Sequence, residues 1–166
     1  AYGEMGPKNW AEFWDVEKFP GRRALRANAQ DLLEAALLSE GVAPEKVYDT
    51  LDEPGGIERA IDRLTELKPH VAVWWSSGAQ SAQILKDGEA DLVQTWNGRA
   101  QSAKDDGGAV AYTFHGSVIG TDCLAVPKGA PHKAEAMKLI AAMTSAEREA
   151  KLTDFIAYRP MIQAAY

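Results

Sequence analysis

The sequence predicts an α/β fold in which a mainly parallel sheet is flanked by helices. Two stretches show the same order of elements: a short apolar strand, a turn and then a helix. Arg22–Arg26 precedes a helix over Asn28–Gly41, and Val71–Trp75 precedes a helix over about Ala79–Lys86. Strands and helices that alternate at this spacing form parallel strand pairs, with helices on both faces of the sheet.

The decapeptide Asp91–Ala100, DLVQTWNGRA, is the stretch around which the chain is organised. Two apolar residues predict a short strand that leads to Trp96, and Asn97-Gly98 predicts a turn just before Arg99. In open α/β sheets, ligands bind at the carboxyl ends of the strands. Trp96 and Arg99 are therefore expected at a binding site rather than in the packed interior.

The helix over Asn28–Gly41 has the clearest start and stop signals. Asn28 is a good N-cap and Asp31 takes the place of a capping-box acid. Because this helix follows a strand directly, both residues are also candidates for ligand contact, and plain capping is at least as good an interpretation. Ser76 and Ser77 follow the neighbouring strand and are further candidates at the same edge.

Similar signals predict the rest of the secondary structure. Asn9 caps a helix in which Trp10, Phe13 and Trp14 form one aromatic stripe for the core. Further helices are expected over residues 44–53, 56–67, 133–144 and 145–154, a turn at 158–160, and strands over Val110–Phe114 and Cys123–Val126.

Composition excludes several classes of function. With 166 residues, of which 46% are hydrophobic, the chain can bury the core of one domain or slightly more. Its net charge of −6 repels phosphate backbones, so nucleic acid is not an expected partner. The single Cys123 and three scattered histidines offer neither a disulfide nor a metal site, and Cys123 is expected to be buried.

Membrane and catalytic motifs do not emerge from the sequence either. No stretch approaches the ~20 apolar residues of a membrane span, and any export signal is expected to be removed or to lie outside the chain. Gly55-Gly56 is not followed by Gly-Lys-Ser/Thr, so it is not a phosphate loop, and no cofactor is expected. His115 and Ser117 share one loop without an acid partner. Binding without chemistry on the ligand is the function that these residues favour.

Distinctive stretches are distributed along nearly the whole chain: NWAEFWDVEKFPGRR, ANAQDLLEAALLSEG, the long connector to a strand and a small polar turn, DGEADLVQTWNGRA, TDCLAVPKGAPHKAEAMKLIAAM and IAYRPM. In this order they resemble the polyamine-type periplasmic solute-binding proteins of ABC importers. The resemblance implies a type II periplasmic-binding-protein lobe, no enzymatic activity and a periplasmic location. It also implies an inner-membrane ABC permease as partner.

Proteins of that family enclose their ligand between two α/β lobes joined by a hinge. The resemblance implies that residues 1–121 form the second, ligand-binding lobe. Residues 122–166 would then cross back and pack on a first lobe that this chain lacks. Apolar surface on the return segment would be exposed in this chain, and self-association is expected.

The resemblance also suggests roles for single residues. An acid at the position of Asp122 accepts an ammonium group in polyamine binders, and a tryptophan at the position of Trp96 packs on the ligand. Tyr158 matches an aromatic residue of the family. Asn28 and Asp31 stand where polyamine binders carry two acids, so one anionic partner for a cation is lost.

Arg99 departs from the family pattern, which has a small residue after Trp-Asn-Gly. A desolvated arginine that faces a polycation is unfavourable, whereas its planar fork matches a carboxylate. Together with Asp122 and Trp96, Arg99 implies a zwitterionic ω-amino acid, as in the variant of this family that selects 4-aminobutyrate. The alternative ligand is a polyamine, putrescine or spermidine. Alternatives of another class are an enzyme on the same fold and an interaction domain without a small ligand.

Overall fold

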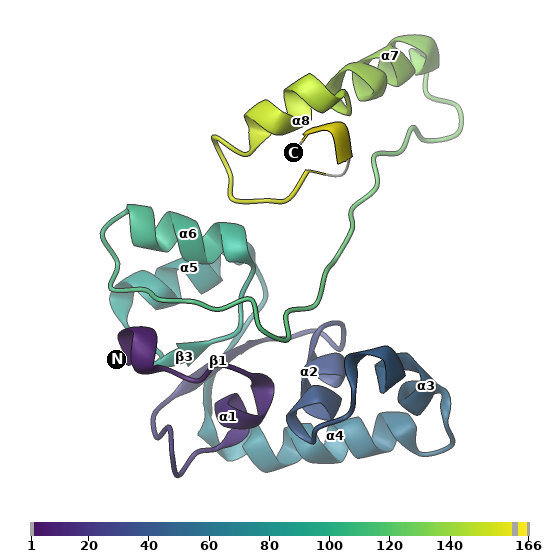
Figure 1. The fold of residues 1–166 in the computed structure, drawn as a ribbon. Coiled ribbons are helices and arrows are strands. Elements are labelled where there is room, and N and C mark those ends of the chain that lie inside the picture. The colour runs from purple at the N-terminus through teal and green to yellow at the C-terminus, as the bar shows by residue number, and fades with distance from the viewer. Residues whose placement is uncertain (1, 161–162, 166) are drawn as a thin grey trace. The chain divides into compact units, whose positions relative to one another are not determined.

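The structure is a computed structural model that describes residues 2–160 and 163–165 (Figure 1). The chain forms two compact units, Ala1–Val118 and Ile119–Tyr166. The first unit contains a sheet and the helices that cover it. The second unit contains helices α7 (Lys133–Met143) and α8 (Ala146–Leu152) and a short 3-10 helix, Gln163–Ala165.

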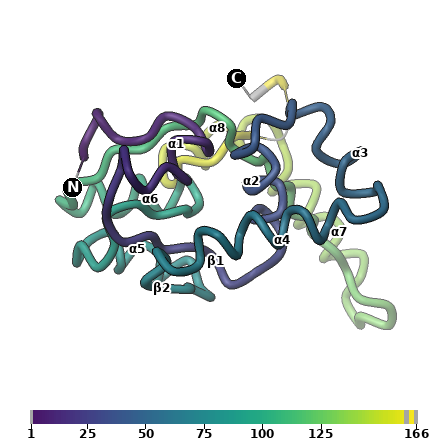
Figure 2. Tube along the Cα trace, turned by 90° about the horizontal axis from the view of Figure 1, so that it is seen from below, coloured from purple at the N-terminus to yellow at the C-terminus, as the bar shows by residue number. Residues whose placement is uncertain are grey.

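In the described part of the chain, three parallel strands form the sheet, in the order β2-β1-β3. β1 (Arg23–Arg26) lies in the centre, between β2 (Val71–Trp75) and β3 (Leu92–Val93). Figure 2 shows β1 and β2 side by side. This arrangement confirms the predicted α/β class with a parallel sheet. Because the strands are parallel, their carboxyl ends lie at the same edge.

Helices cover both faces of this sheet, as predicted (Figure 1). The helices of the first unit are α1 (Trp10–Trp14), α2 (Leu32–Ser39), α3 (Val47–Asp52), α4 (Gly56–Leu67), α5 (Gly78–Asp87) and α6 (Asn97–Asp105). On one face, Leu25 of β1 belongs to an apolar cluster with residues of α1, α2 and α4. On the other face, Ala24 belongs to a cluster with Trp75 and with Ile84 of α5. Leu25 and Ala24 are both fully buried, so both faces of β1 are shielded from solvent.

The aromatic stripe of α1 packs in the core, as predicted. Asn9 caps this helix, and its side-chain oxygen accepts a hydrogen bond from the backbone N–H of Glu12. Phe13 and Trp14 are buried. Trp10 meets both rings edge-on, at centroid distances of 5.6 and 6.2 Å. The stripe therefore serves packing, as its spacing predicts.

The helix predicted over Asn28–Gly41 begins later than expected, at Leu32. The Asn28 side chain accepts a hydrogen bond from the backbone N–H of Gln30 and forms a local turn instead of a helix cap. Asp31 has a φ of 71°, a left-handed conformation that does not continue a helix. The capping roles predicted for Asn28 and Asp31 are therefore wrong.

Two predicted strands, Val110–Phe114 and Cys123–Val126, do not form in the described chain. Both segments are irregular, and neither pairs with a described strand. A strand is stable only when a neighbouring strand satisfies its backbone N–H and C=O groups. An apolar pattern does not supply that neighbour. Cys123 is exposed, so the prediction that it is buried is also wrong.

The other predicted helices form close to their expected bounds. α3 follows a 3-10 turn at Pro44–Lys46, and α7 and α8 lie where the spacing placed them. α4 begins at Gly56, and this position requires glycine, because a Cβ there would lie 1.8 Å from the backbone oxygen of Thr50. Among the described residues, no helix combines the length and the apolar character needed to cross a bilayer.

Replacing Leu25 with alanine is expected to lower the free energy of unfolding by about 2–5 kcal/mol, because it leaves a cavity between β1 and its helices. The control is Ile61→Ala on α4, where the side chain is 49% exposed. It is expected to change stability by about 0.5 kcal/mol or less. Urea unfolding followed by circular dichroism measures both. Equal losses in the two variants would contradict the central place of β1.

Candidate functional site

The parallel sheet brings three segments together at the carboxyl ends of its strands. Arg26–Asp31 runs on from β1, Ser76–Gly78 follows β2, and Gln94–Arg99 follows β3. These segments are called the carboxyl-end rim below. Ligands of open α/β proteins bind at such an edge. All predicted ligand-binding residues of the first unit lie on this rim.

Trp96 is held on the rim by two neighbours. Trp75, buried at the end of β2, meets the Trp96 ring edge-on at a centroid distance of 5.5 Å. The indole N–H of Trp75 donates to the backbone oxygen of Gln94 at 2.9 Å, which fixes Trp75 against the segment that carries Trp96. The guanidinium carbon of Arg26 lies 4.9 Å from the centroid of the Trp96 ring, within the range of a cation–π interaction. Trp96 is therefore a fixed, half-buried wall of the rim.

Arg99 lies on the first turn of α6, because the helix begins at Asn97. The predicted turn at Asn97-Gly98 is therefore wrong. Gly98 is buried, and tertiary packing outweighs the turn preference of the pair. A Cβ on Gly78 would lie 2.7 Å from both Nε of Arg99 and Cζ3 of Trp96. Gly78 thus leaves the space in which these two side chains meet, and Arg99 stays exposed there.

Asp31 forms an ion pair with Arg26. Nη1 of Arg26 lies 3.3 Å from Oδ2 of Asp31, and the two side chains are only 21% and 15% exposed. The backbone N–H of Arg26 donates to the side-chain oxygen of Gln94 at 2.9 Å, which links the pair to the segment after β3. The Asp31 carboxylate is therefore already engaged by a cation of its own chain.

Asn28, Ser76 and Ser77 are exposed on the rim and make local hydrogen bonds. Ser77 caps α5, and its hydroxyl oxygen accepts from the backbone N–H of Gln80 at 3.2 Å. The Ser76 N–H donates to the Gln80 side-chain oxygen at 2.9 Å. Asn28 bonds the N–H of Gln30, as described above. These contacts give all three residues a structural role, and a role in ligand binding stays a prediction.

Sequence reasoning missed two residues of the rim, Arg26 and Gln94. The predicted strand 22–26 contains Arg26 without giving it a place in the site. The available signal was its position as the last residue of a strand, where a side chain borders the rim. Gln94 is 9% exposed and is the polar residue directly after β3, which is an equally local signal. Its contact with Arg26 joins residues 68 positions apart, which no spacing rule indicates.

Asp122 and Tyr158 lie in the second unit. Asp122 is exposed in the irregular segment before α7. Tyr158 is 39% exposed, and its backbone N–H donates to the oxygen of Ile156 at 2.7 Å. Both side chains are accessible to solvent. Because they belong to a different unit from Arg99, a shared ligand between Arg99 and Asp122 stays a prediction.

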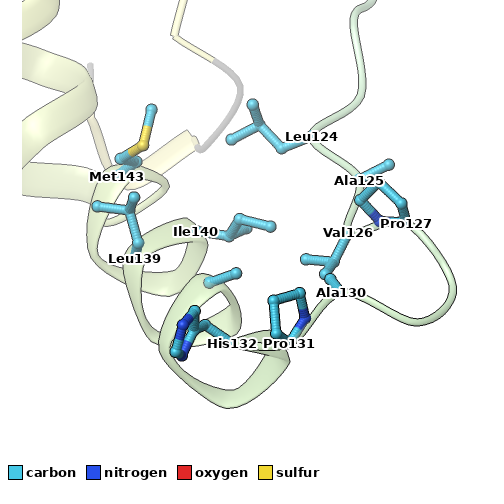
Figure 3. A pocket seen from close by; sticks show the side chains of 11 residues that line it. Leu124, Ala125, Val126, Pro127, Ala130, Pro131, His132, Leu139, Ile140 and Met143 are labelled. Atoms are coloured by element: carbon cyan, nitrogen blue, oxygen red, sulfur yellow. The ribbon is translucent and has the colours of Figure 1, made fainter.

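The second unit also contains an apolar cavity of about 340 Å³ (Figure 3). It lies between the irregular segment and α7, and its lining residues are Leu124, Ala125, Val126, Pro127, Ala130, Pro131, His132, Ala136, Leu139, Ile140 and Met143. The lining has no carboxylate and no arginine. Apart from His132 its lining side chains are apolar, so it offers a small charged solute fewer partners than the carboxyl-end rim.

Chemistry on a bound ligand receives no support from the remaining candidates. His115 and Ser117 are both exposed in one irregular stretch. Within residues 2–160 and 163–165, no three His, Cys, Asp or Glu side chains are grouped to hold a metal ion. The arrangement that the structure does show is a pair of arginines beside a tryptophan, which suits recognition of charge.

Known proteins similar to this chain are solute-binding proteins. A family model described as bacterial extracellular solute-binding protein matches residues 2–166. A gamma-aminobutyric acid-binding protein from Pseudomonas aeruginosa is 39% identical over 155 residues, which are 93% of this chain and 44% of that protein. Spermidine/putrescine-binding periplasmic protein 1 from Haemophilus influenzae is 31% identical over 152 residues, which are 90% of this chain and 40% of that protein.

A solved structure extends this similarity to the fold. The crystal structure of the PBP MotA from A. tumefaciens B6 in complex with glucopine superimposes with a TM-score of 0.87 and 45% sequence identity. The match covers 99% of this chain and 51% of MotA. This chain thus spans about half the length of its relatives or less. The match confirms the predicted periplasmic-binding-protein fold.

Replacing Gly78 with alanine is expected to displace Trp96 and Arg99, because the added Cβ would lie 2.7 Å from an atom of each. Overpacking of this kind is expected to lower the free energy of unfolding by about 1–3 kcal/mol. Near-ultraviolet circular dichroism and tryptophan emission report the displacement. The control is Ala79→Ser at the next, exposed residue, which is expected to leave both spectra unchanged. Spectra of the Gly78 variant that match the wild type would contradict the close approach.

Proposed function

The chain belongs to the family of bacterial extracellular solute-binding proteins, and we propose that it is part of an ABC-importer receptor for a zwitterionic ω-amino acid such as 4-aminobutyrate. In this proposal Arg99 binds the ligand carboxylate and Asp122 binds its ammonium group. Trp96 and Tyr158 border the apolar spacer between these charges. The family is one of binding proteins, and the receptor is expected to release its solute unchanged.

The position of the Arg99 guanidinium carries this proposal. It is exposed on the rim, next to Trp96 and over Gly78. In the part of the chain that the structure describes, no carboxylate forms an ion pair with it. A guanidinium binds a carboxylate through two parallel N–H···O bonds. A hydrogen bond to a charged group contributes about 1.5–3 kcal/mol, which is sufficient to select for an anionic group at this place.

The relatives support two ligand classes. The Pseudomonas aeruginosa relative is named for gamma-aminobutyric acid, and the Haemophilus influenzae relative is named for spermidine and putrescine. A polyamine remains the second candidate because of the latter. Arg99 disfavours it, since a guanidinium and an ammonium group repel each other when a closing receptor removes the water between them.

This chain spans 44% of the gamma-aminobutyric acid-binding relative. The proposal therefore concerns a longer receptor of which this chain forms a part. Residues 1–121 would form the second lobe, and residues 122–166 would return to a first lobe. Large apolar side chains of the return segment are exposed, among them Leu124, Leu139 and Phe155, and a partner surface would cover them. An inner-membrane permease and a periplasmic location follow from the proposed role in import.

Binding between two lobes also supplies a mechanism for delivery. A ligand that touches both lobes favours the closed receptor over the open one by its difference in affinity for the two states. Such a hinge closure is a common response of binding proteins to their solute. The permease would recognise the closed form, so that only loaded receptors deliver a solute.

In the full-length receptor, meaning this chain together with its proposed first lobe, Arg99→Gln is expected to weaken 4-aminobutyrate binding by about 10–100-fold. Asp122→Asn is expected to have an effect of similar size, because it removes the partner of the ammonium group. The control is Arg59→Gln, which breaks an exposed ion pair with Glu40 at 2.7 Å, away from the rim. It is expected to leave the affinity unchanged. Isothermal titration calorimetry measures all three variants.

The same titrations distinguish the alternatives. Tight putrescine binding by the wild type without a 4-aminobutyrate signal would refute the role of Arg99. Tight glutamate binding would refute the proposal that the ligand has a long spacer between its charges, because an α-amino acid holds its ammonium and α-carboxylate groups close together. A thermal-shift screen without any small-molecule hit would favour an interaction domain instead.

A further inference from the structure

Arg26 occupies a central position on the carboxyl-end rim. It is the last residue of β1, and its backbone N–H is fixed by the side chain of Gln94. Its guanidinium lies 4.9 Å from the Trp96 ring centroid and 3.3 Å from the Asp31 carboxylate. One side chain therefore engages both the aromatic ring and the acid that border the ligand-binding edge.

Asp31 adopts an unusual backbone conformation at this contact. Among the described residues it is the one non-glycine residue with a positive φ, at 71°. Residues other than glycine rarely adopt this left-handed backbone conformation. Those that do are found mainly at sites where the surrounding structure holds them in place. The ion pair with Arg26 is a contact of this kind, because it fixes the Asp31 carboxylate beside β1.

Without Arg26, the same residues would form a cation site. Asp31 would be an unpaired carboxylate with a largely shielded side chain, and one more face of Trp96 would be open. The carboxylate would attract an ammonium group through its charge, and the uncovered tryptophan ring would do so through its negative face. Arg26 satisfies both attractions internally and adds its own positive charge to the rim that also carries Arg99.

We propose that Arg26 determines the charge specificity of the rim, by pairing with Asp31 and covering Trp96 so that a ligand ammonium group can use neither. This inference rests on the proposed function for the identity of the preferred solute. It adds that rejection of diamines is built into the second lobe by a residue other than Arg99. Removal of Arg26 therefore shifts the preference of the receptor from a zwitterion towards a dication.

The test compares putrescine and 4-aminobutyrate binding to the full-length receptor by calorimetry. Arg26→Gln is expected to strengthen putrescine binding at least about tenfold, because it frees Asp31 and Trp96. The same variant is expected to weaken 4-aminobutyrate binding about tenfold, since the freed carboxylate repels the ligand carboxylate. The double variant Arg26→Gln with Asp31→Asn is expected to lose the gain in putrescine affinity. If the role of Arg26 were purely structural, Arg26→Gln would weaken the binding of both ligands alike. The single variant would then show no gain in putrescine affinity for the double variant to lose.

Two further variants control for folding and for general charge effects. Arg26→Met keeps an unbranched side chain over Trp96 but removes the charge, so it tests the part of the gain that comes from the freed Asp31 carboxylate if the glutamine variant does not fold. Arg22→Gln breaks another arginine–aspartate contact, with Asp91 at 3.6 Å, at the opposite end of the same strand. It removes the same formal charge and is expected to leave the affinity for putrescine unchanged.

The two proposals fail in different ways. A wild-type receptor that does not bind 4-aminobutyrate overturns the proposed function, while the putrescine series still tests Arg26. No gain in putrescine affinity in the folded Arg26 variants overturns the role of Arg26. So does a gain that persists when Asp31 is also replaced, or an equal gain in Arg22→Gln.

Discussion

The first unit depends on the central strand β1, which is only four residues long and yet has a neighbour on every side. β2 and β3 pair with its two edges, and Leu25 and Ala24 are fully buried on its two faces. Even Arg23 is fully buried, and its guanidinium donates to the backbone oxygens of Gly21 at 2.7 Å and Phe13 at 3.2 Å. Burial lowers the pKa of this guanidinium, and the carbonyl oxygens compensate for the water it has lost. A strand so constrained delivers its last residue, Arg26, to a fixed place on the rim.

Most polar residues of the rim stabilise the fold through contacts within the chain. Ser77 caps α5, Asn28 closes a local turn, and Asp31 is paired with Arg26. Arg99 is different, because it is exposed and forms no ion pair with a described carboxylate. The site thus offers a solute one arginine whose charge the fold has not used. This asymmetry supports the proposal that the carboxyl-end rim binds an anionic group rather than a cation.

The sequence predicts well what local patterns determine. The stripe of α1, the span of β2 and the start of α4 depend on side-chain spacing, capping and glycine, and all formed as expected. The start of α2 did not, because Asn28 has a second local hydrogen-bonding option that spacing cannot weigh against capping. The missing strand at Val110–Phe114 depends on a neighbour elsewhere in the chain. The place of Arg26 on the rim follows from contacts with Gln94 and Trp96, about seventy residues away, which become visible only in three dimensions.

The proposed ligand contacts lie in different units, and this has a consequence for selectivity. Arg99 belongs to Ala1–Val118, and Asp122 belongs to Ile119–Tyr166. A zwitterion that satisfies both must span the separation that the assembled receptor imposes between them. A spacer that is too short leaves one buried charge without its partner, which costs more than the contact contributes when it is made. In our proposals, Arg26 and Arg99 of the first unit select for an anionic ligand group, and Asp122 of the second unit binds the ammonium group.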